Sequence, residues 1–273
     1  MTAKTTLVLG GTGKTGRRIV EQLAARNLPV RIGSRSAQPA FAWEDPGTWP
    51  VALANVDAVY ISYYPDLAAP GATDAIQAFT DLAVRSGVRR LVLLSGRGEP
   101  EAQRCEEIVK RSGAQWTVLR CSWFNQNFSE NYLLEPILAG EVALPAPDVG
   151  EPFVDADDIA DAAVAALTDN KHIGQLYELT GPRLLTFAEA IAQIGRAVGR
   201  EIRYVQVPME EYVAALEQAQ LPPDFVALIK YLFTEVLDGR NAYVTDGVQR
   251  ALGRAPRDFS DYARRAAASG AWV

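Results

Sequence analysis

Short apolar runs alternate with stretches of helical spacing along the first half of the chain. Continuous apolar runs of this length are typical of parallel strands buried on both faces; they cover residues 5–10, 30–34, 57–62, 90–95 and 116–121. Residues 70–87 and 99–113 carry apolar positions at helical spacing and end at glycine, a common residue after a last helical turn. Repeated strand–helix units predict an α/β fold with a doubly wound parallel sheet.

The pattern loosens after residue 121. Residues 151–167 begin as a strand and continue as a helix that Asp155 or Asp157 caps. Two more strands are predicted at 175–181 and 201–208, and further helices at 186–199, 209–220, 223–238 and 258–268. We predict a sheet domain over residues 1–121, to which 151–180 contribute further sheet and helix. A smaller, mostly helical substrate lobe, residues 122–150 and 181–273, is expected over the carboxyl edge of the sheet.

A glycine-rich segment lies between the first strand and the helix after it. Residues 10–16 read GGTGKTG, the spacing of a dinucleotide-binding loop in the strand–helix context that this motif requires. Its glycines permit a tight turn, close approach of a pyrophosphate and close packing of helix and strand. The helix N-terminus supplies free N–H groups and a positive partial charge. We predict a Rossmann-type unit whose cofactor loop is formed by Gly10, Thr12, Gly13, Lys14, Thr15 and Gly16.

The same segment also resembles the end of a Walker A phosphate loop. That motif requires a glycine at position 8, where this chain has Val8 inside the predicted strand. A nucleoside triphosphate loop is therefore not expected.

The residues after the second strand favour NADP(H). NAD-selective units place an acidic residue there to hold the ribose 2′-hydroxyl. This chain has Ser34 and Arg35 and no acid. Arginine makes charge-assisted hydrogen bonds to a 2′-phosphate, and a serine hydroxyl adds a donor. We predict that NADPH (NADP+) is the cofactor and that NADH is less favoured.

Further candidate residues follow the carboxyl ends of other strands, where open α/β sheets bind ligands. We expect Ser62, Tyr63 and Ser95 to contact the cofactor. Tyr63, Ser95 and Trp123 are expected to position the nicotinamide and the substrate. The rings in this region can form an aromatic wall for a flat or cationic substrate, or serve as ordinary core; they are Tyr63, Tyr64, Trp123, Phe124 and Phe128.

A proton-donating pair of the Tyr-x-x-x-Lys type is absent from the sequence. No tyrosine has a lysine four residues later, which disfavours ordinary ketone reduction through such a pair. Glu106, Glu107 and Lys110 lie where the pair is expected, and we interpret them as a solvated helix face. An iminium ion needs no proton donor, because hydride addition gives a neutral amine directly. A quinone is strongly electrophilic and needs little help from an acid.

The composition of the chain limits the kinds of binding partner that we expect for it. The formal net charge is −6 with no basic block, so nucleic acid is not expected. No stretch suits a membrane span or a signal peptide, which makes a cytoplasmic location the expectation. Cys105 and Cys121 form no metal or disulfide pattern, and His172 is predicted to lie in a surface turn without a catalytic role. We expect a small-molecule substrate and no metal.

Several segments together resemble the NmrA-like branch of the atypical short-chain dehydrogenases, and the resemblance covers nearly the whole chain. They include GGTGKTG (10–16), RLVLLSG (90–96), SGAQWTVLRCSWFNQNF (112–128), PFVDADDIADAA (152–163) and YELTGPRLLTFAEA (177–190). WEDPGTW (43–49), YYPD (63–66) and LSGRGEPEA (94–102) are most similar to the ergot alkaloid (festuclavine and agroclavine) dehydrogenase-like subgroup. This resemblance implies an NADPH-dependent reductase, often of an iminium. It also implies cofactor roles for Gly10, Gly13, Gly16 and Arg35, with Tyr63, Tyr64, Ser95 and Trp123 near the nicotinamide.

Three hypotheses follow from these observations. The first is an NADPH-dependent oxidoreductase acting on a cyclic iminium or a similar electrophile in secondary metabolism. The second keeps the enzyme but makes the acceptor a quinone or enone. The third is a non-catalytic NADP(H) sensor with a protein partner, a class that the resembling branch also includes; the absence of a basic region and of a long tail counts against it.

Overall fold

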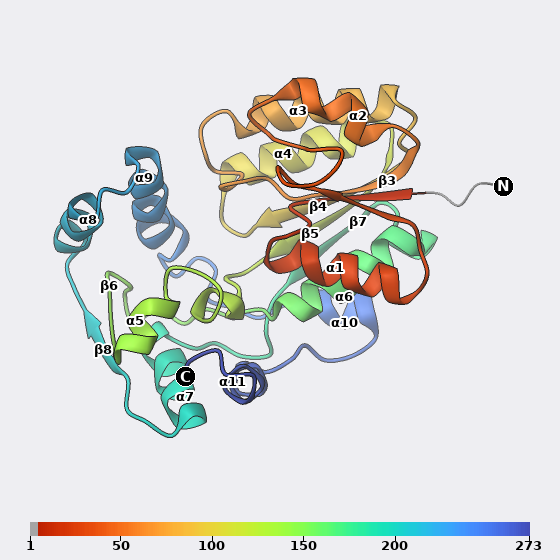
Figure 1. Ribbon diagram of the computed structural model, residues 1–273. Coiled ribbons are helices and arrows are strands. Elements are labelled where there is room, and N and C mark those ends of the chain that lie inside the picture. The colour runs from red at the N-terminus through yellow and green to blue at the C-terminus, as the bar shows by residue number, and fades with distance from the viewer. Residues whose placement is uncertain (1–4) are drawn as a thin grey trace. The chain divides into compact units, whose positions relative to one another are not determined.

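The computed structural model describes residues 5–273, which form two compact units (Figure 1). The first unit holds the described residues up to Cys121 together with 156–179 and 247–254. The second holds 122–155, 180–246 and 255–273. The sequence places residues 247–254 in the lobe, but their short helix packs against the last strand and a helix of the sheet unit.

The first unit is built on a six-stranded sheet in which every neighbouring pair is parallel. The strand order is β2-β1-β3-β4-β5-β7, so the order reverses between β1 and β3. In open α/β sheets this reversal marks the crevice where ligands bind. The strands are β1 Thr5–Leu9, β2 Val30–Gly33, β3 Val56–Ile61, β4 Arg90–Gly96, β5 Gln115–Cys121 and β7 Gln175–Leu179.

Helices cover both faces of this sheet, as Figure 1 shows. One face carries α1 (Lys14–Ala25), α6 (Ala156–Thr168) and α10 (Gly247–Leu252). The other carries α2 (Trp49–Leu53), α3 (Ala72–Arg85) and α4 (Pro100–Arg111). The predicted doubly wound parallel fold is therefore confirmed.

Helix α1 shows how local sequence positions these layers. Ile19 and Leu23 have the spacing of one helical face, and both are fully buried. The helix ends before Asn27, which takes a left-handed φ of 56° and donates its N–H to the Ala24 carbonyl at 2.9 Å. Asparagine tolerates this conformation better than most residues, so the chain turns there into β2.

The second unit contains a two-stranded parallel sheet and helices around an aromatic core. Its strands are β6 Glu141–Leu144 and β8 Arg203–Gln206. Its α-helices are α5 Leu134–Ala139, α7 Phe187–Val198, α8 Met209–Gln218, α9 Pro223–Tyr231 and α11 Phe259–Ala268. Thr186 and Glu189 form a reciprocal capping box at the start of α7. Four buried phenylalanines pack together at the centre: Phe128, Phe153, Phe187 and Phe259.

Two expectations about local structure are wrong, and a third, the helix predicted over 223–238, is refined. Residues 151–154 form isolated bridges instead of a strand, and α6 begins at Ala156. The helix predicted over 223–238 ends at Tyr231 and continues as one π-helical turn, Leu232–Val236. His172 is completely buried in a short 3₁₀ turn, Asn170–His172, with its ring Nδ1 2.9 Å from the Tyr177 hydroxyl. The residues on either side of His172 in the sequence are largely polar, so the sequence pattern did not indicate that its side chain is buried.

No helix within residues 5–273 combines the length and the hydropathy that a membrane span requires.

Trp272 is a sensitive probe of the second unit. Its side chain is 2% exposed, and its indole N–H donates to the Phe128 carbonyl at 2.8 Å. We expect Trp272→Ala to lower the free energy of unfolding by about 3–5 kcal/mol, because it leaves a cavity and an unpaired carbonyl. Val244→Ala, at a half-exposed side chain, should change that free energy by less than about 0.5 kcal/mol. Urea denaturation measures both, and equal losses would contradict the packing described.

Candidate functional site

The loop between β1 and α1 makes a sharp turn at the end of the first strand. Gly10 has a φ of 64°, a left-handed conformation that favours glycine. The N–H of Gly13 donates to the Gly10 carbonyl at 2.8 Å and closes the turn. The chain therefore enters α1 directly beneath the end of β1.

Gly16 allows the helix to approach this turn. A Cβ placed on Gly16 would lie 2.1 Å from the Gly10 carbonyl oxygen and 2.8 Å from the Gly11 Cα. Both obstacles are backbone atoms, so no side-chain movement relieves the clash. Only glycine at position 16 permits this packing.

The first turn of α1 has the features of an anion site. Gly13 is the N-cap and has no side chain to accept a hydrogen bond from the first helical N–H groups. The first turn contains no acidic residue, and Lys14 lies in it. Unpaired N–H groups and the helix dipole attract phosphate in this arrangement. Thr12 is exposed beside them.

Thr15 faces the protein instead of solvent. It is 4% exposed, and its Oγ1 accepts a hydrogen bond from the Tyr60 hydroxyl at 3.0 Å. Tyr60 belongs to β3 and is fully buried, and burial raises the pKa of its phenol. This bond ties the start of α1 to β3. We therefore interpret Thr15 as a residue that holds the loop in place.

The end of β2 presents the two residues predicted to select the cofactor. Arg35 is exposed and has no ion-pair partner in the described part of the chain. The Ser34 hydroxyl lies 3.4 Å from that of Ser36. The N–H of Gly11 donates to the Gly33 carbonyl at 3.4 Å, so the cofactor loop and this strand end are neighbours. A guanidinium here is available to a phosphate.

Ser62 and Tyr63 follow β3 beside the cofactor loop. A Cβ built on Gly10 would lie 3.4 Å from the Ser62 Oγ. The Ser62 carbonyl accepts a hydrogen bond from the Trp43 indole N–H at 3.1 Å. The Tyr63 ring packs on the Trp43 ring with centroids 4.9 Å apart. Trp43, which sequence reasoning did not single out, thus fixes the segment that carries both predicted residues.

Ser95 in β4 donates its hydroxyl hydrogen inward. Its acceptor is Glu106 Oε1 at 2.7 Å. Glu106 is completely buried and accepts two hydrogen bonds from the Arg120 guanidinium, at 2.9 and 2.6 Å. The interpretation of Glu106 as part of a solvated helix face is wrong, whereas Glu107 is exposed. Because the Ser95 hydroxyl hydrogen is used in the bond to Glu106, the Ser95 oxygen can accept a hydrogen bond from a ligand but does not donate one.

Trp123 lies in the second unit, within its aromatic core. Its ring packs against Phe187 with centroids 5.3 Å apart and against Phe233 at 5.2 Å. Its backbone N–H donates to Glu151 Oε1 at 3.2 Å. Core packing therefore occupies part of this half-buried ring. Phe128 is completely buried in the same core, so it is not available as a wall to a ligand.

Two carboxyl groups that sequence reasoning missed lie beyond β3 and β4. Asp66 and Glu99 hydrogen-bond to each other through their side chains. Burial and the Asp66 carboxylate raise the pKa of Glu99 well above its ordinary value. The quoted segments YYPD and LSGRGEPEA contain them, but no sequence pattern indicated that they meet.

Cys105 lies in α4, and Cys121 is the last residue of β5. Both are free and buried, and burial raises the pKa of Cys105 to about 11. The part of the chain that the structure describes contains no cluster of potential metal ligands.

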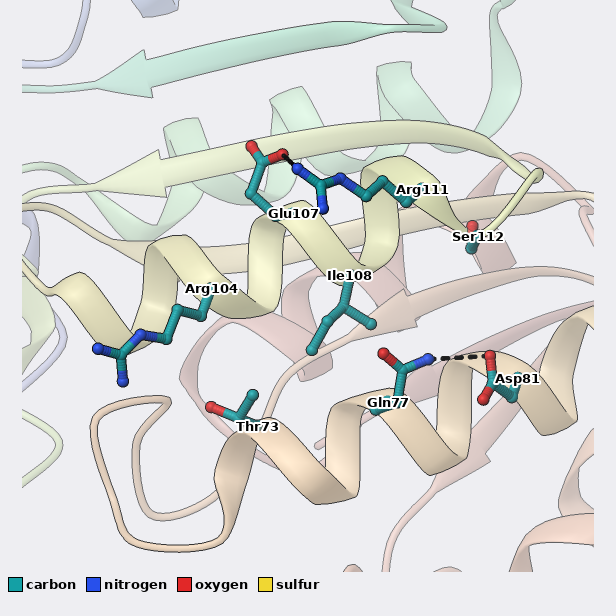
Figure 2. A pocket seen from close by; sticks show the side chains of 8 residues that line it. All are labelled: Thr73, Gln77, Asp81, Arg104, Glu107, Ile108, Arg111 and Ser112. Carbon is teal, nitrogen blue, oxygen red and sulfur yellow. Dashed lines mark hydrogen bonds and ion pairs between the residues drawn. The ribbon is translucent and has the colours of Figure 1, made fainter.

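A hollow of about 470 Å³ lies along α3 and α4, away from the strand ends (Figure 2). Its charged side chains already have partners. Gln77 donates to Asp81 at 3.0 Å, and Arg111 pairs with Glu107 at 3.5 Å. It is open and polar, and it has none of the features of the cofactor loop.

Comparisons with known proteins agree with this geometry. A family model described as NAD(P)H-binding matches residues 10–170, and one described as the NmrA-like family matches 102–263. Agroclavine dehydrogenase from Claviceps fusiformis is 32% identical, over 94% of this chain and 96% of the relative. An NAD(P)H azoreductase from Xenophilus azovorans is 31% identical, over 96% and 98%.

A solved structure supports the fold. The NADPH-dependent quinone oxidoreductase from Escherichia coli, complexed with NADPH, superposes with a TM-score of 0.76. It covers 95% of this chain and 99% of its own, at 19% identity. At that identity the match describes the architecture.

Gly16→Ala tests the cofactor loop. The added Cβ clashes with the Gly10 carbonyl, so the loop must move and its N–H groups lose their alignment. We expect NADPH binding to weaken about 10- to 100-fold, the loss of one charge-assisted hydrogen bond. Gly47→Ala is the control, because a Cβ there meets mainly the flexible Asp45 side chain. Calorimetric titration with NADPH measures both; unchanged affinity in Gly16→Ala would argue against the loop as the binding site.

Proposed function

Because this chain belongs to the NmrA-like family, we propose that it is an NADPH-dependent reductase that transfers hydride to an electrophilic small molecule, first of all a cyclic iminium ion. The family, the NAD(P)H-binding class and the oxidoreductase class predicted from the sequence are confirmed. The choice of NADPH and the iminium acceptor are our proposals.

One observation carries the proposal: a helix N-terminus with a glycine N-cap and no acidic residue in its first turn lies at the end of β1, where the strand order reverses. The glycine turn places free N–H groups there for a pyrophosphate. A dinucleotide bound in this way extends along the carboxyl edge of the sheet, toward the ends of β3 and β4. Ser62, Tyr63 and Ser95 lie at those ends and are proposed to contact the nicotinamide half.

Arg35 supports NADPH over NADH. An exposed guanidinium without an ion-pair partner follows β2, and no acid stands there to hold a ribose 2′-hydroxyl. A 2′-phosphate would supply the missing charge and accept the hydrogen bonds.

The chemistry of the strand ends supports an acceptor that reacts without strong acid assistance. Ser95 gives its hydroxyl hydrogen to Glu106. Burial, with the nearby Glu44 carboxylate, raises the pKa of the Tyr63 phenol, and no lysine opposes this. Iminium ions already carry the charge that hydride neutralises. The similarity to agroclavine dehydrogenase supports an acceptor of this general kind.

A quinone or a similar neutral acceptor is the second candidate. The hydrogen-bonded carboxyl pair of Asp66 and Glu99 favours it, because burial raises the pKa of both groups and so favours a protonated carboxyl that can act as an acid. The similarity to an azoreductase also supports a neutral acceptor.

Arg35→Ala tests the cofactor preference. We expect NADPH binding to weaken about 10- to 100-fold, since a charge-assisted hydrogen bond is worth roughly 1.5–3 kcal/mol. NADH binding should stay within about threefold, because NADH lacks the 2′-phosphate. Arg85→Ala, at an exposed position on α3, controls for the loss of one positive charge. Equal weakening of both cofactors would contradict the proposed contact.

Tyr63→Ala and Trp123→Ala test substrate positioning. If both rings orient the acceptor, kcat/KM with an iminium substrate should fall at least about tenfold, a larger change than the rise in the NADPH dissociation constant. Tyr243→Ala, at a half-exposed ring, is the control and should leave both quantities unchanged. Parallel losses of turnover and NADPH binding would place these residues in cofactor binding or folding instead.

A further inference from the structure

The hydrogen-bonded Asp66 and Glu99 lie at the carboxyl edge of the sheet. β3 and β4 are parallel neighbours, with Ile61 opposite Leu93. Asp66 comes five residues after the end of β3, and Glu99 comes three residues after the end of β4. The chain therefore brings both carboxyl groups to the edge where this fold binds its ligands, beside the strand that carries Ser62 and Tyr63.

The pair is buried without a compensating cation. Glu99 is 6% exposed, and Asp66 is half-buried. Neither group has an ion-pair partner in the described part of the chain. Two adjacent carboxylates cannot both ionise cheaply in such a place, so they share one proton. The groups that face Glu99 are all acidic: Asp66 from the β3–α3 loop, and Glu101 and Glu106 from α4.

The backbone leaves room for this carboxyl group. A Cβ built on Gly96 would lie 2.2 Å from Glu99 Oε1 and 2.7 Å from Oε2. Any other residue at the end of β4 would displace the acid. Oε2 of Glu99 is buried and receives no hydrogen bond from an N–H or hydroxyl donor within residues 5–273. A buried carboxyl group without such donors favours its protonated form.

Asp66 is held in place for this contact. Its Oδ1 accepts a hydrogen bond from the Ala68 N–H at 2.8 Å, which fixes the carboxylate within its own turn. Burial also raises the pKa of Asp66, and its hydrogen bonds to Ala68 and Glu99 oppose that rise. Glu99 is therefore the member that keeps the proton and Asp66 the member that carries the charge.

Other groups near this edge are poorly suited to donate a proton. The Ser95 hydroxyl is an alcohol and therefore a far weaker acid than a carboxyl group, and Arg97 pairs with Glu178 at 2.6 Å. Burial raises the pKa of the Cys105 thiol to about 11, which makes it a weak acid at neutral pH. Burial likewise raises the pKa of the Tyr63 phenol. Glu99 is left as the acid of suitable strength.

We propose that Glu99, held protonated by Asp66, donates the proton that a neutral acceptor such as a quinone needs when it takes hydride at this site. This rests on the proposed reductase function and extends its substrates beyond iminium ions. The C4–H bond of the dihydronicotinamide breaks, and its electron pair moves with the hydrogen to the acceptor. The acceptor's developing oxyanion takes the proton of the Glu99 carboxyl. NADP+, the hydroquinone and a Glu99 carboxylate result, and water restores the proton after product release.

The experiment compares Glu99→Gln with wild type on two acceptors, a benzoquinone and a cyclic iminium ion. Glutamine keeps the shape and can donate to Asp66, but it has no acidic proton. We expect quinone kcat/KM to fall roughly 100-fold or more, the usual size of general acid catalysis, with iminium turnover and NADPH affinity within about threefold. Glu21→Gln, at an exposed position on α1 that does not face Glu99, is the matched control and should leave both acceptors unaffected.

The pH profile separates proton donation from a structural role. Since the protonated acid is the active form, wild-type quinone kcat/KM should fall as pH rises through the pKa of Glu99. Asp66→Asn removes the adjacent negative charge and lowers that pKa, so the fall should move to lower pH. Glu99→Gln should show no such fall, and iminium turnover should not follow it.

Several results would overturn the proposal. One is an equal loss with both acceptors in Glu99→Gln, which would mean a structural role. Another is a selective quinone loss in Tyr63→Phe with Glu99→Gln unaffected. Absence of quinone turnover with iminium turnover intact would overturn the proton donor alone and leave the proposed reductase standing. Independently of turnover, the infrared difference between wild type and Glu99→Gln at neutral pH should contain the C=O stretch of a protonated carboxyl, and its absence would also refute the proposal.

Discussion

The close approach of Gly16 to the Gly10 carbonyl sets the position of the start of α1 relative to the end of β1, and the proposed cofactor site depends on that position. With a Cβ at position 16 only 2.1 Å from that oxygen, α1 would have to withdraw from the end of β1. The first helical N–H groups would then leave the point where the strand order reverses. The hydrogen bond from the Tyr60 hydroxyl to Thr15 Oγ1 also keeps the start of α1 close to the sheet, because Tyr60 belongs to β3. The proposed binding of the pyrophosphate at this loop thus depends on backbone packing more than on particular side chains.

The carboxyl edge contains two buried acids whose different surroundings give them different states. Glu106 accepts hydrogen bonds from Arg120 and Ser95, so its charge is compensated. Glu99 faces only acidic groups, foremost Asp66, and with its burial they raise its pKa well above the ordinary value. The same residue type therefore serves as an ion-pair partner in one case and as the proposed acid in the other. In our proposal, this contrast lets one edge bind a cofactor and also supply a proton.

The sequence was sufficient for the parts of the fold that depend on local pattern. Continuous apolar strands, glycine spacing and helical periodicity correctly predicted the parallel sheet and the glycine turn between β1 and α1, whereas the cofactor contacts of that turn and of Arg35 stay predictions. The sequence pattern did not predict the long-range contacts between side chains. His172 sits among polar neighbours in the sequence, yet it packs against Tyr177. Glu106 looks like part of an exposed face until Arg120, from the next strand, is placed beside it. Pairings across strands depend on register and tertiary packing, which periodicity does not encode.

The most direct measurement of the central claim follows the hydrogen itself. Wild-type protein is incubated without oxygen with NADPH carrying two deuterium atoms at C4 and with a cyclic iminium ion, and the product is examined by mass spectrometry. The account predicts one deuterium on the former iminium carbon for each NADPH oxidised. It would be contradicted if NADPH bound at the loop, as calorimetry reports, and yet remained reduced with iminium and quinone acceptors alike.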